Sequence, residues 1–134
     1  MPYLNDISKM IRGIGTDILQ LERARNALKR TPGLAKRVLT PVELDSYKKS
    51  GVGERFFAKR FAAKEAIVKA LGTGIGRGVS WQHIEITNNE LGKPEVTLSA
   101  GAQEHAKRQG IATMHISYSD EQDYVVAFAV AESA

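Results

Sequence analysis

The first pattern along the chain is a short-period alternation of apolar and polar positions, which predicts a strand over residues 10–19. In this segment, MIRGIGTDIL, one side of the strand carries Gly13, Gly15 and Asp17. Glycines inside a strand mark a place where a ligand or another part of the backbone comes close. Because the two glycines leave space beside Asp17, we expect a ligand there.

Apolar residues at helical spacing follow this strand. Residues 21–29 have one apolar face and predict a helix. Thr40, with Glu43 three residues later, has the sequence of a capping box and predicts the start of a short helix. That helix ends at the glycines of residues 51–53, and residues 54–71 then predict a long helix.

The second half of the chain predicts two antiparallel hairpins separated by a helix. Strand-like runs are joined in pairs by polar turns. We expect strands at residues 81–86, 95–99, 112–119 and 124–132, and a helix at residues 100–109. Helices and antiparallel strands interspersed without a linker or a repeat predict a single α+β domain, with the antiparallel sheet packed against the long helix.

The long helix places one charged residue on its apolar side. With about 100° of rotation per residue, Lys64 lies about 20° from Phe57, in the middle of the apolar stripe. A buried ammonium without a partner costs several kcal/mol, so Lys64 needs an anionic partner or a route to water. The middle of the stripe offers a poor route to water. We therefore expect an anion beside Lys64.

Charged residues of this helix define a candidate phosphate and metal site. The helix presents Arg60, Lys64, Glu65 and Lys69 around one region. Lysine and arginine neutralise phosphoryl oxygens, and a carboxylate holds Mg²⁺. One carboxylate is seldom enough for this ion, and Asp17 is the natural second ligand. Two simpler interpretations stay open, which are an i,i+4 surface pair of Glu65 with Lys69 and a helix N-cap at Asp17.

Composition and charge narrow the class of protein only in part. The 134 residues suffice for one core, and the absence of cysteine excludes disulfides and thiol chemistry. The chain has no apolar run of membrane-spanning length and no signal-peptide pattern, so we expect a cytoplasmic location. The net charge is +4, but residues 23–37 contain six basic residues and no acidic one. This block is either a solvated helix face or a docking surface for an acidic partner.

The glycine run GTGIGRG, residues 72–78, does not match a nucleotide-binding pattern. A dinucleotide fingerprint follows a strand and opens a helix, whereas this run follows a helix. The carboxyl end of a helix is also the negative end of its dipole, which does not favour phosphate. The run is either a helix C-cap with a turn or a place where the backbone approaches an elongated ligand.

Two motifs at their observed separation closely resemble those of one family. The segments GIGTDILQLER and RFAAKEAIVKALGTGIG, together with LTPVELDSY, NELGKPEVTL and HISYSDEQDYVVAFAVAE, are similar to holo-acyl-carrier-protein synthases, the small bacterial phosphopantetheinyl transferases. The resemblance implies Mg²⁺-dependent transfer of 4′-phosphopantetheine from coenzyme A to a serine of apo-acyl carrier protein, with release of adenosine 3′,5′-bisphosphate. It also implies a role in fatty acid biosynthesis, the α+β phosphopantetheinyl transferase fold and a homotrimer.

The resemblance implies a role for each residue of the candidate site. Asp17 and Glu65 stand at the family's metal-binding positions. Catalytic roles fall to Glu65 and Lys69, and either Glu65 or a metal-bound water takes the proton of the serine. Arg23 and Arg30 would dock the acidic acyl carrier protein by electrostatic steering. Coenzyme A would contact the basic and glycine-rich positions, with its pyrophosphate beside Lys64; these positions are Arg60, Lys64, Gly72, Thr73 and Gly74.

The sequence departs from the family pattern at two places. Asp120 stands where many members have histidine, so the role of that histidine does not carry over, and we expect Asp120 to lie near the site. Residues 1–9 precede the usual start of the family. We interpret them as an N-terminal extension, either an upstream start or an expression remnant, before a single phosphopantetheinyl transferase domain at residues 10–134.

A non-catalytic basic RNA-binding module is the alternative interpretation. It would use the basic block of residues 23–37 against phosphates. That block is not interleaved with aromatic residues, so it offers no platform for stacking bases. The alternative also leaves Asp17, Lys64 and Glu65 without a role. We therefore expect coenzyme A and an acyl carrier protein as partners, and neither nucleic acid nor a membrane.

Overall fold

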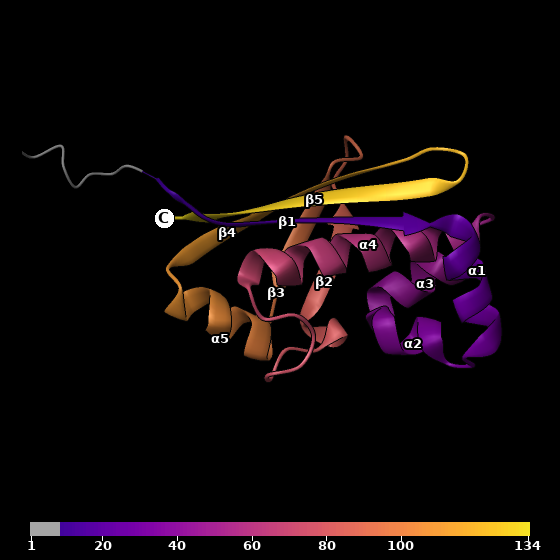
Figure 1. Cartoon of the computed structure of the whole chain (residues 1–134), viewed down its shortest axis with the longest axis horizontal. Coiled ribbons are helices and arrows are strands. Elements are labelled where there is room, and N and C mark those ends of the chain that lie inside the picture. Colours follow the sequence, from indigo (N-terminus) through magenta and orange to yellow (C-terminus); the bar gives the residue numbers. More distant parts are fainter. Residues whose placement is uncertain (1–8) are drawn as a thin grey trace, which may run out of the picture.

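One long helix, α4 (Gly53–Leu71), lies along an antiparallel sheet of three strands (Figure 1). The computed structural model describes residues 9–134. The strands are β1 (Ile11–Gln20), β4 (Ile111–Asp120) and β5 (Tyr124–Ser133), and their order in the sheet is β1-β5-β4. The expected N-terminal extension, residues 1–9, lies outside the described residues except for Lys9.

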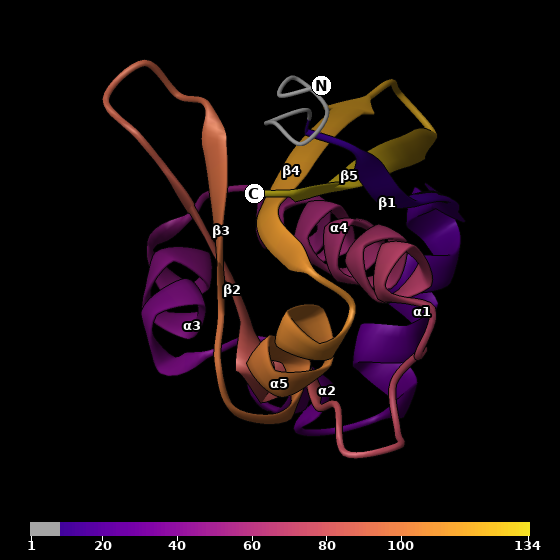
Figure 2. The same ribbon diagram turned by 90° about the vertical axis from the view of Figure 1, so that its left-hand side faces the viewer.

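Short helices and a second pair of strands surround α4 (Figure 2). Three helices connect β1 to α4, and they are α1 (Leu21–Arg30), α2 (Leu34–Val38) and α3 (Pro41–Lys49). After α4, the strands β2 (Ile84–Asn88) and β3 (Pro94–Leu98) form a two-stranded antiparallel hairpin, and α5 (Ala100–Arg108) leads to β4. The hairpin lies between α3, which contacts β2, and β4, which contacts β3.

The α+β class and the antiparallel pairing predicted from the sequence are confirmed. The capping box at the start of α3 is also confirmed. The Glu43 N–H donates to Thr40 Oγ1 at 3.3 Å, and the Thr40 N–H donates to Glu43 Oε1 at 2.9 Å. This box fixes the side chain of Glu43 at the point where α3 begins, and Glu43 is buried there.

Two local predictions were incomplete. Helix α2 was not predicted, because its five residues are too few to display a helical period. The strand expected over residues 81–86 begins only at Ile84, because Trp81–His83 forms a 3₁₀ turn. The Ser80 side chain accepts a hydrogen bond from the Gln82 N–H and caps this turn.

Glycines let α4 approach β1 closely. A Cβ atom built at Gly15 would collide with the carbonyl oxygen of Ala66, and one built at Gly13 would collide with that of Ala70. The expectation that these glycines leave room for a ligand is therefore wrong, because the backbone of α4 fills the space. The same side of the sheet is lined by small buried residues of β5, namely Val125, Ala127, Ala129 and Ala131.

The opposite face of the sheet is apolar and exposed. Side chains between 44% and 66% exposed project from β1 and β5, and they are Ile14, Ile18, Val126 and Phe128. Exposed apolar groups that cluster on one face mark an interaction surface more often than isolated ones do. Within residues 9–134, no helix is long and apolar enough to span a bilayer.

Candidate functional site

Asp17 lies on β1 beside α4. In the sheet it is paired with Ala127 of β5, and its side chain is only 17% exposed. Because the glycine contacts hold α4 against β1, Lys69 reaches across to the strand. Its Nζ lies 3.3 Å from Asp17 Oδ1 and donates a hydrogen bond to the Thr16 carbonyl at 2.8 Å. Asp17 is thus joined to the carboxyl-terminal part of the long helix.

Glu65 lies one turn before Lys69 on α4 and is partly buried. Burial raises the pKa of Glu65, the negative charge of Asp17 raises it further, and Lys69 opposes the change. Burial also raises the pKa of Asp17, against a smaller opposing effect of the hydrogen bond from Lys69. The structure therefore brings Asp17, Glu65 and Lys69 together, and two carboxylates share one cation.

This carboxylate pair has the chemistry of a divalent-cation site that a substrate completes. Mg²⁺ commonly takes one or two carboxylates and fills the rest of its shell with water and substrate phosphate oxygens. No group of three or more candidate metal ligands occurs within residues 9–134. A cation beside Asp17 and Glu65 would offset the like charge that raises the pKa of Glu65. The two residues thus fit Mg²⁺ with phosphate oxygens better than a closed all-protein site.

Lys64 has its partner within the protein, which corrects the role expected for it. The side chain is fully buried, and Nζ donates to Glu43 Oε1 at 2.6 Å and to the Val38 carbonyl at 2.7 Å. A third hydrogen bond goes to the Trp81 carbonyl at 3.1 Å. The expected anion is present, but it is Glu43 and not the pyrophosphate of a ligand. Since all three donors of the ammonium are used, Lys64 has none left for coenzyme A.

The structure likewise turns Arg60 away from the carboxylate pair. Its guanidinium donates to Tyr118 Oη at 2.8 Å and to Asn88 Oδ1 at 3.2 Å, and its Nε lies 3.8 Å from Glu43 Oε2. The same group stacks 4.6 Å above the ring of Phe56. Arg60 is 7% exposed, so the expected contact with coenzyme A is replaced by contacts inside the protein.

The glycine run after α4 begins as a helix C-cap. Gly72 has a φ of 78°, and the N–H groups of Thr73 and Gly74 both donate to the Val68 carbonyl, at 3.1 and 3.3 Å. The C-cap interpretation is therefore confirmed. A Cβ atom at Gly72 or Gly74 would meet nothing within 4 Å, so both residues border open space. Contact of this segment with an elongated ligand stays a prediction.

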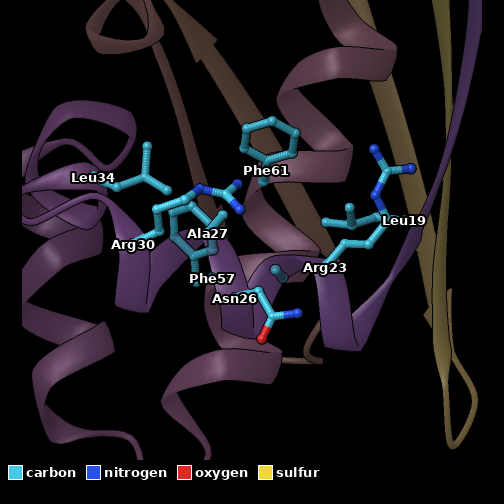
Figure 3. A pocket seen from close by; sticks show the side chains of 9 residues that line it. Leu19, Arg23, Asn26, Ala27, Arg30, Leu34, Phe57 and Phe61 are labelled. Atoms are coloured by element: carbon cyan, nitrogen blue, oxygen red, sulfur yellow. The ribbon is translucent and has the colours of Figure 1, made fainter.

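A groove beside the carboxylate pair carries the two arginines expected to dock a partner (Figure 3). It has a volume of about 420 Å³ and is lined by Leu19, Arg23, Ala24, Asn26, Ala27, Arg30, Leu34, Phe57 and Phe61. Figure 3 shows the side chain of Arg30 over Phe57 and that of Arg23 near Leu19. Leu19 is two residues from Asp17, and Phe61 is one helical turn from Glu65. The groove therefore opens next to the carboxylates.

Asp120, the last residue of β4, contacts a different part of α4. Its carboxylate lies 2.6 Å from Arg55 Nη1 and 3.3 Å from Lys59 Nζ, in the first half of the helix, whereas Asp17 pairs near the last turn. Arg55 also donates to the Glu121 carbonyl at 2.8 Å. Partial burial acts to raise the pKa of Asp120, but the hydrogen bonds from Arg55 and Lys59 outweigh it and lower this pKa. Asp120 thus fastens the β4–β5 turn to α4.

Two contributions to this region were not predicted from the sequence. Glu43 was assigned only to the capping box, yet its second oxygen accepts the Ile86 N–H at 2.8 Å while the first binds Lys64. A lone cation on an apolar stripe, with a capping-box glutamate upstream, is the signal that could have suggested this pair. The apolar floor of the groove was also missed, because Leu34 lies on the unpredicted helix α2.

Residues 13–129 match the sequence profile of the 4′-phosphopantetheinyl transferase superfamily. A holo-[acyl-carrier-protein] synthase of Shewanella piezotolerans is 53% identical over 131 residues, which cover 92% of this chain and 100% of the relative. The crystal structure of the holo-[acyl-carrier-protein] synthase of Neisseria meningitidis matches with a TM-score of 0.86 at 46% identity, over 91% of this chain and 98% of that one. The Bacillus anthracis enzyme in complex with CoA (3′,5′-ADP) matches with a TM-score of 0.78 at 38% identity, over 93% and 99% of the two chains.

These matches include every element that builds the site. The profile covers β1 from Gly13 onward with Asp17, α1 with its arginines and the whole of α4. The resemblance seen in the sequence motifs is confirmed over more than nine-tenths of the chain. The chain therefore belongs to the 4′-phosphopantetheinyl transferase superfamily.

Proposed function

We propose that this protein transfers the 4′-phosphopantetheine group of coenzyme A to a serine of an apo-acyl carrier protein. One observation carries the proposal, which is the meeting of Asp17, Glu65 and Lys69 beside a basic groove. The names of its relatives support it, since they are holo-acyl-carrier-protein synthases, and one was solved with CoA (3′,5′-ADP). The cytoplasm and fatty acid biosynthesis are the setting of this proposal.

The reaction exchanges one phosphorus–oxygen bond for another. The carrier serine Oγ forms a bond to the β-phosphorus of coenzyme A. The bond from that phosphorus to the bridging oxygen breaks, and adenosine 3′,5′-bisphosphate leaves with the electron pair. Such a transfer depends on charge neutralisation and in-line positioning more than on a covalent nucleophile. A set of fixed charges beside a docking groove meets those needs.

Each residue of the cluster has a separate task. Asp17 and Glu65 would hold Mg²⁺, which when bound would stabilise charge on the phosphoryl group and on the leaving bisphosphate. Lys69, whose side chain is 53% exposed, supplies a cation to the phosphate oxygens. Glu65 would also accept the proton of the serine hydroxyl, since its carboxylate belongs to the same cluster.

Coenzyme A would extend from this cluster along the segment after α4. Gly72 and Gly74 border open space, and the Thr73 hydroxyl donates only to the neighbouring Gly74 carbonyl at 2.8 Å. A backbone without side chains lets an elongated ligand approach closely. Arg60 and Lys64 are no longer part of this assignment, because both side chains are buried and make their hydrogen bonds to groups within the protein.

The carrier protein would enter along the groove of α1. Arg23 and Arg30 are exposed and flank its apolar floor, so an acidic surface with a small apolar contact would be complementary to it. Because Leu19 and Phe61 lie near the carboxylate pair, a partner seated there would bring its serine toward the reacting phosphate. Arg23 and Arg30 are thus assigned to protein docking rather than to RNA.

A homotrimer is the assembly that we propose for the exposed sheet face. Its apolar side chains, Ile14, Ile18, Val126 and Phe128, would be covered by the same face of two further copies in closed cyclic symmetry. Light scattering should give three times the monomer mass, and Ile18→Glu with Phe128→Glu should give a folded monomer. A wild-type monomer at micromolar concentration would refute the trimer.

Intact mass spectrometry tests the proposed reaction. The protein is incubated with apo-acyl carrier protein, coenzyme A and Mg²⁺, and the carrier is weighed. We expect the mass to rise by one phosphopantetheine group, and the rise to disappear when Mg²⁺ is chelated. No gain with several different apo-carriers would refute the transferase function, and a gain that survives chelation would refute the metal assignment.

A further inference from the structure

The buried pair of Lys64 and Glu43 takes no part in the proposed transfer, although Lys64 is the residue directly before Glu65. Both side chains are fully buried and lie 2.6 Å apart. A buried ion pair seldom adds stability beyond that of apolar residues of the same volume, because each charge loses its hydration. A role beyond stability is therefore worth seeking in the directions of its hydrogen bonds.

The hydrogen bonds of Lys64 join α4 to three separate segments. Lys64 donates to Val38 at the end of α2, to Glu43 on α3 and to Trp81 in the 3₁₀ turn. Glu43 in turn accepts the N–H groups of Thr40 and Ile86, at 2.9 and 2.8 Å. Apolar packing allows a helix to roll or slide slightly, whereas a set of directional bonds in a dry interior does not.

The contact of α4 with β1 does not supply the same constraint. There the helix backbone at Ala66 and Ala70 lies against Gly13 and Gly15, which have no side chains to interlock with it. A smooth glycine surface permits close approach but resists rotation of the helix weakly, since rotation is blocked by interlocking side chains. On that side the directional bonds come from the half-exposed Lys69, to Thr16 and Asp17. The fully buried bonds of Lys64 on the other flank therefore constrain the rotation of α4 more firmly.

Rotation matters because consecutive residues lie about 100° apart around a helix. A roll of about 20° would move a carboxylate about 6 Å from the helix axis by about 2 Å. A displacement of about 1 Å at a reacting centre can lower the rate about a hundredfold. A change in the rotation of α4 would thus change the distance between Glu65 and Asp17.

We propose that the Lys64–Glu43 pair is a positioning device that fixes the rotation of α4 so that Glu65 faces Asp17. The proposal rests on the proposed function for its kinetic consequence, but the placement of Glu65 is a property of the protein alone. It makes Lys64 and Glu43 positioning residues, because neither touches the substrate.

The test removes both charges together. Lys64→Met alone leaves the buried Glu43 with only the more distant Arg60, whose Nε lies 3.8 Å away, and should lower the melting temperature. Removal of a lone surplus cation would raise it instead. The double variant Lys64→Met/Glu43→Gln leaves no buried charge in the pair. The single variant Glu43→Gln, which keeps a neutral acceptor for Lys64, provides a second folded protein if the double variant unfolds.

The control is an exposed ion pair that joins α4 to a different neighbouring helix, α1. Arg25 Nε lies 2.8 Å from Glu54 Oε1, between α1 and the first turn of α4, and both side chains are about half exposed, at 44% and 46%. The variant Arg25→Met/Glu54→Gln removes the same types of charge at the opposite end of the helix. It should leave both readouts below unchanged.

Two readouts separate positioning from plain stability. In the transfer assay at a temperature where all variants are folded, kcat should fall about tenfold to a hundredfold, while KM for the apo-carrier changes less than twofold. With Mn²⁺ alone as the probe, the concentration that half-broadens the backbone NMR signals of residues 16–18 should rise at least threefold.

A folded variant with wild-type kcat and a wild-type Mn²⁺ midpoint would overturn the proposal, even if its melting temperature fell. A wild-type protein that transfers nothing would refute the proposed function instead, and the Mn²⁺ arm would still decide whether the pair places Glu65.

Discussion

The two flanks of α4 hold similar charges in opposite conditions. On the flank of Lys64, the ammonium and Glu43 are fully buried, and every donor of the ammonium has an acceptor. On the flank of Glu65, the carboxylate of Asp17 lies nearby, and burial together with this like charge raises the pKa of Glu65. The charge of Lys64 is balanced within the protein, whereas Asp17 and Glu65 share only the cation of Lys69.

This difference arises between adjacent residues of the sequence. Lys64 and Glu65 are neighbours in the sequence and lie on the same helix, so they differ mainly in the direction in which their side chains leave it. A charged residue whose partners are all satisfied inside the protein contributes to structure. One whose carboxylate is desolvated beside a like charge is poised to receive a cation, and such perturbed groups gather at functional sites.

The largest expected effect is the loss of transfer when the open flank is neutralised. Asp17→Asn or Glu65→Gln should lower turnover by about 10²–10⁴-fold, because several kcal/mol of charge stabilisation at the metal would be lost. The rate of carrier mass gain at saturating substrate measures it. Turnover within threefold of wild type at limiting Mg²⁺ would contradict the metal assignment.

The same two variants sharpen the comparison through stability. Burial raises the folded pKa of both carboxyls above their ordinary values of 3.8 and 4.5. The two carboxyl groups therefore stabilise the fold fully at a pH below their ordinary pKa values. This stabilisation is lost as the pH rises through their higher folded pKa values. At pH 7 each variant should melt at the same temperature as the wild-type protein or higher, with no advantage below pH 4. A lower melting temperature at pH 7 would make this flank structural too.

Gly15→Ala should lower both stability and turnover, since the added Cβ would push α4 away from β1. Overpacking of this kind costs about 1–3 kcal/mol, and turnover should also fall because Asp17 and Glu65 separate. Scanning calorimetry and the transfer assay measure the two effects. Gly51→Ala is the control, because a Cβ there would meet nothing within 4 Å. Equal results for the two variants would refute the close-contact explanation.

Reversing the charge of an arginine in the groove should weaken binding of the apo-carrier and leave the rate of transfer nearly unchanged. Arg23→Glu and Arg30→Glu should each raise KM for the apo-carrier about tenfold, with kcat nearly unchanged and a weaker dependence on salt. Lys29→Glu, on the same helix but outside the groove lining, should change KM far less. If all three variants weaken the carrier equally, the basic block acts only through its net charge.

The smallest expected effect concerns Asp120, which pairs with Arg55 and Lys59 in the first half of α4. Because Arg55 and Lys59 lower its folded pKa, its contribution to stability is present above the ordinary value of 3.8 and is lost as the pH falls through the folded value. Solvent screening keeps this contribution to about 0.5 kcal/mol. Asp120→Asn should therefore lower the melting temperature slightly at pH 7 and not at pH 2, with unchanged turnover.

Much of the fold could be predicted because its signals are local. Strand alternation, the capping box of Thr40 and Glu43, and the glycines that end helices all act within a few residues. Helix α2 was not predicted, because its five residues are too few for a helical period to be seen. The pairing of Asp17 with Glu65 was predicted from residue types, because Mg²⁺ needs oxygen ligands wherever they lie in the chain, and their role as metal ligands stays a prediction.

The direction of Lys64 could not be predicted, because its partner lies on another helix. Periodicity placed the ammonium in the core and implied an anion, but both Glu43 and a bound phosphate satisfied that requirement. Arg60 was assigned to the ligand for the same reason, whereas Tyr118 and Asn88 accept its hydrogen bonds. Which of two anions meets a buried cation is decided by tertiary packing, and no local pattern reports it.

The position of β1 has a consequence for synthesis on the ribosome. Asp17 comes early in the chain, but its strand pairs only with β5, and the Thr16 hydroxyl bonds the Ala127 carbonyl across 111 residues of sequence. Strand β1 therefore has no partner in the sheet until β5 has left the exit tunnel, and contacts so distant in sequence form late. A nascent chain stalled before β5 would carry all of the proposed active-site residues and still lack the strand pairing that places Asp17.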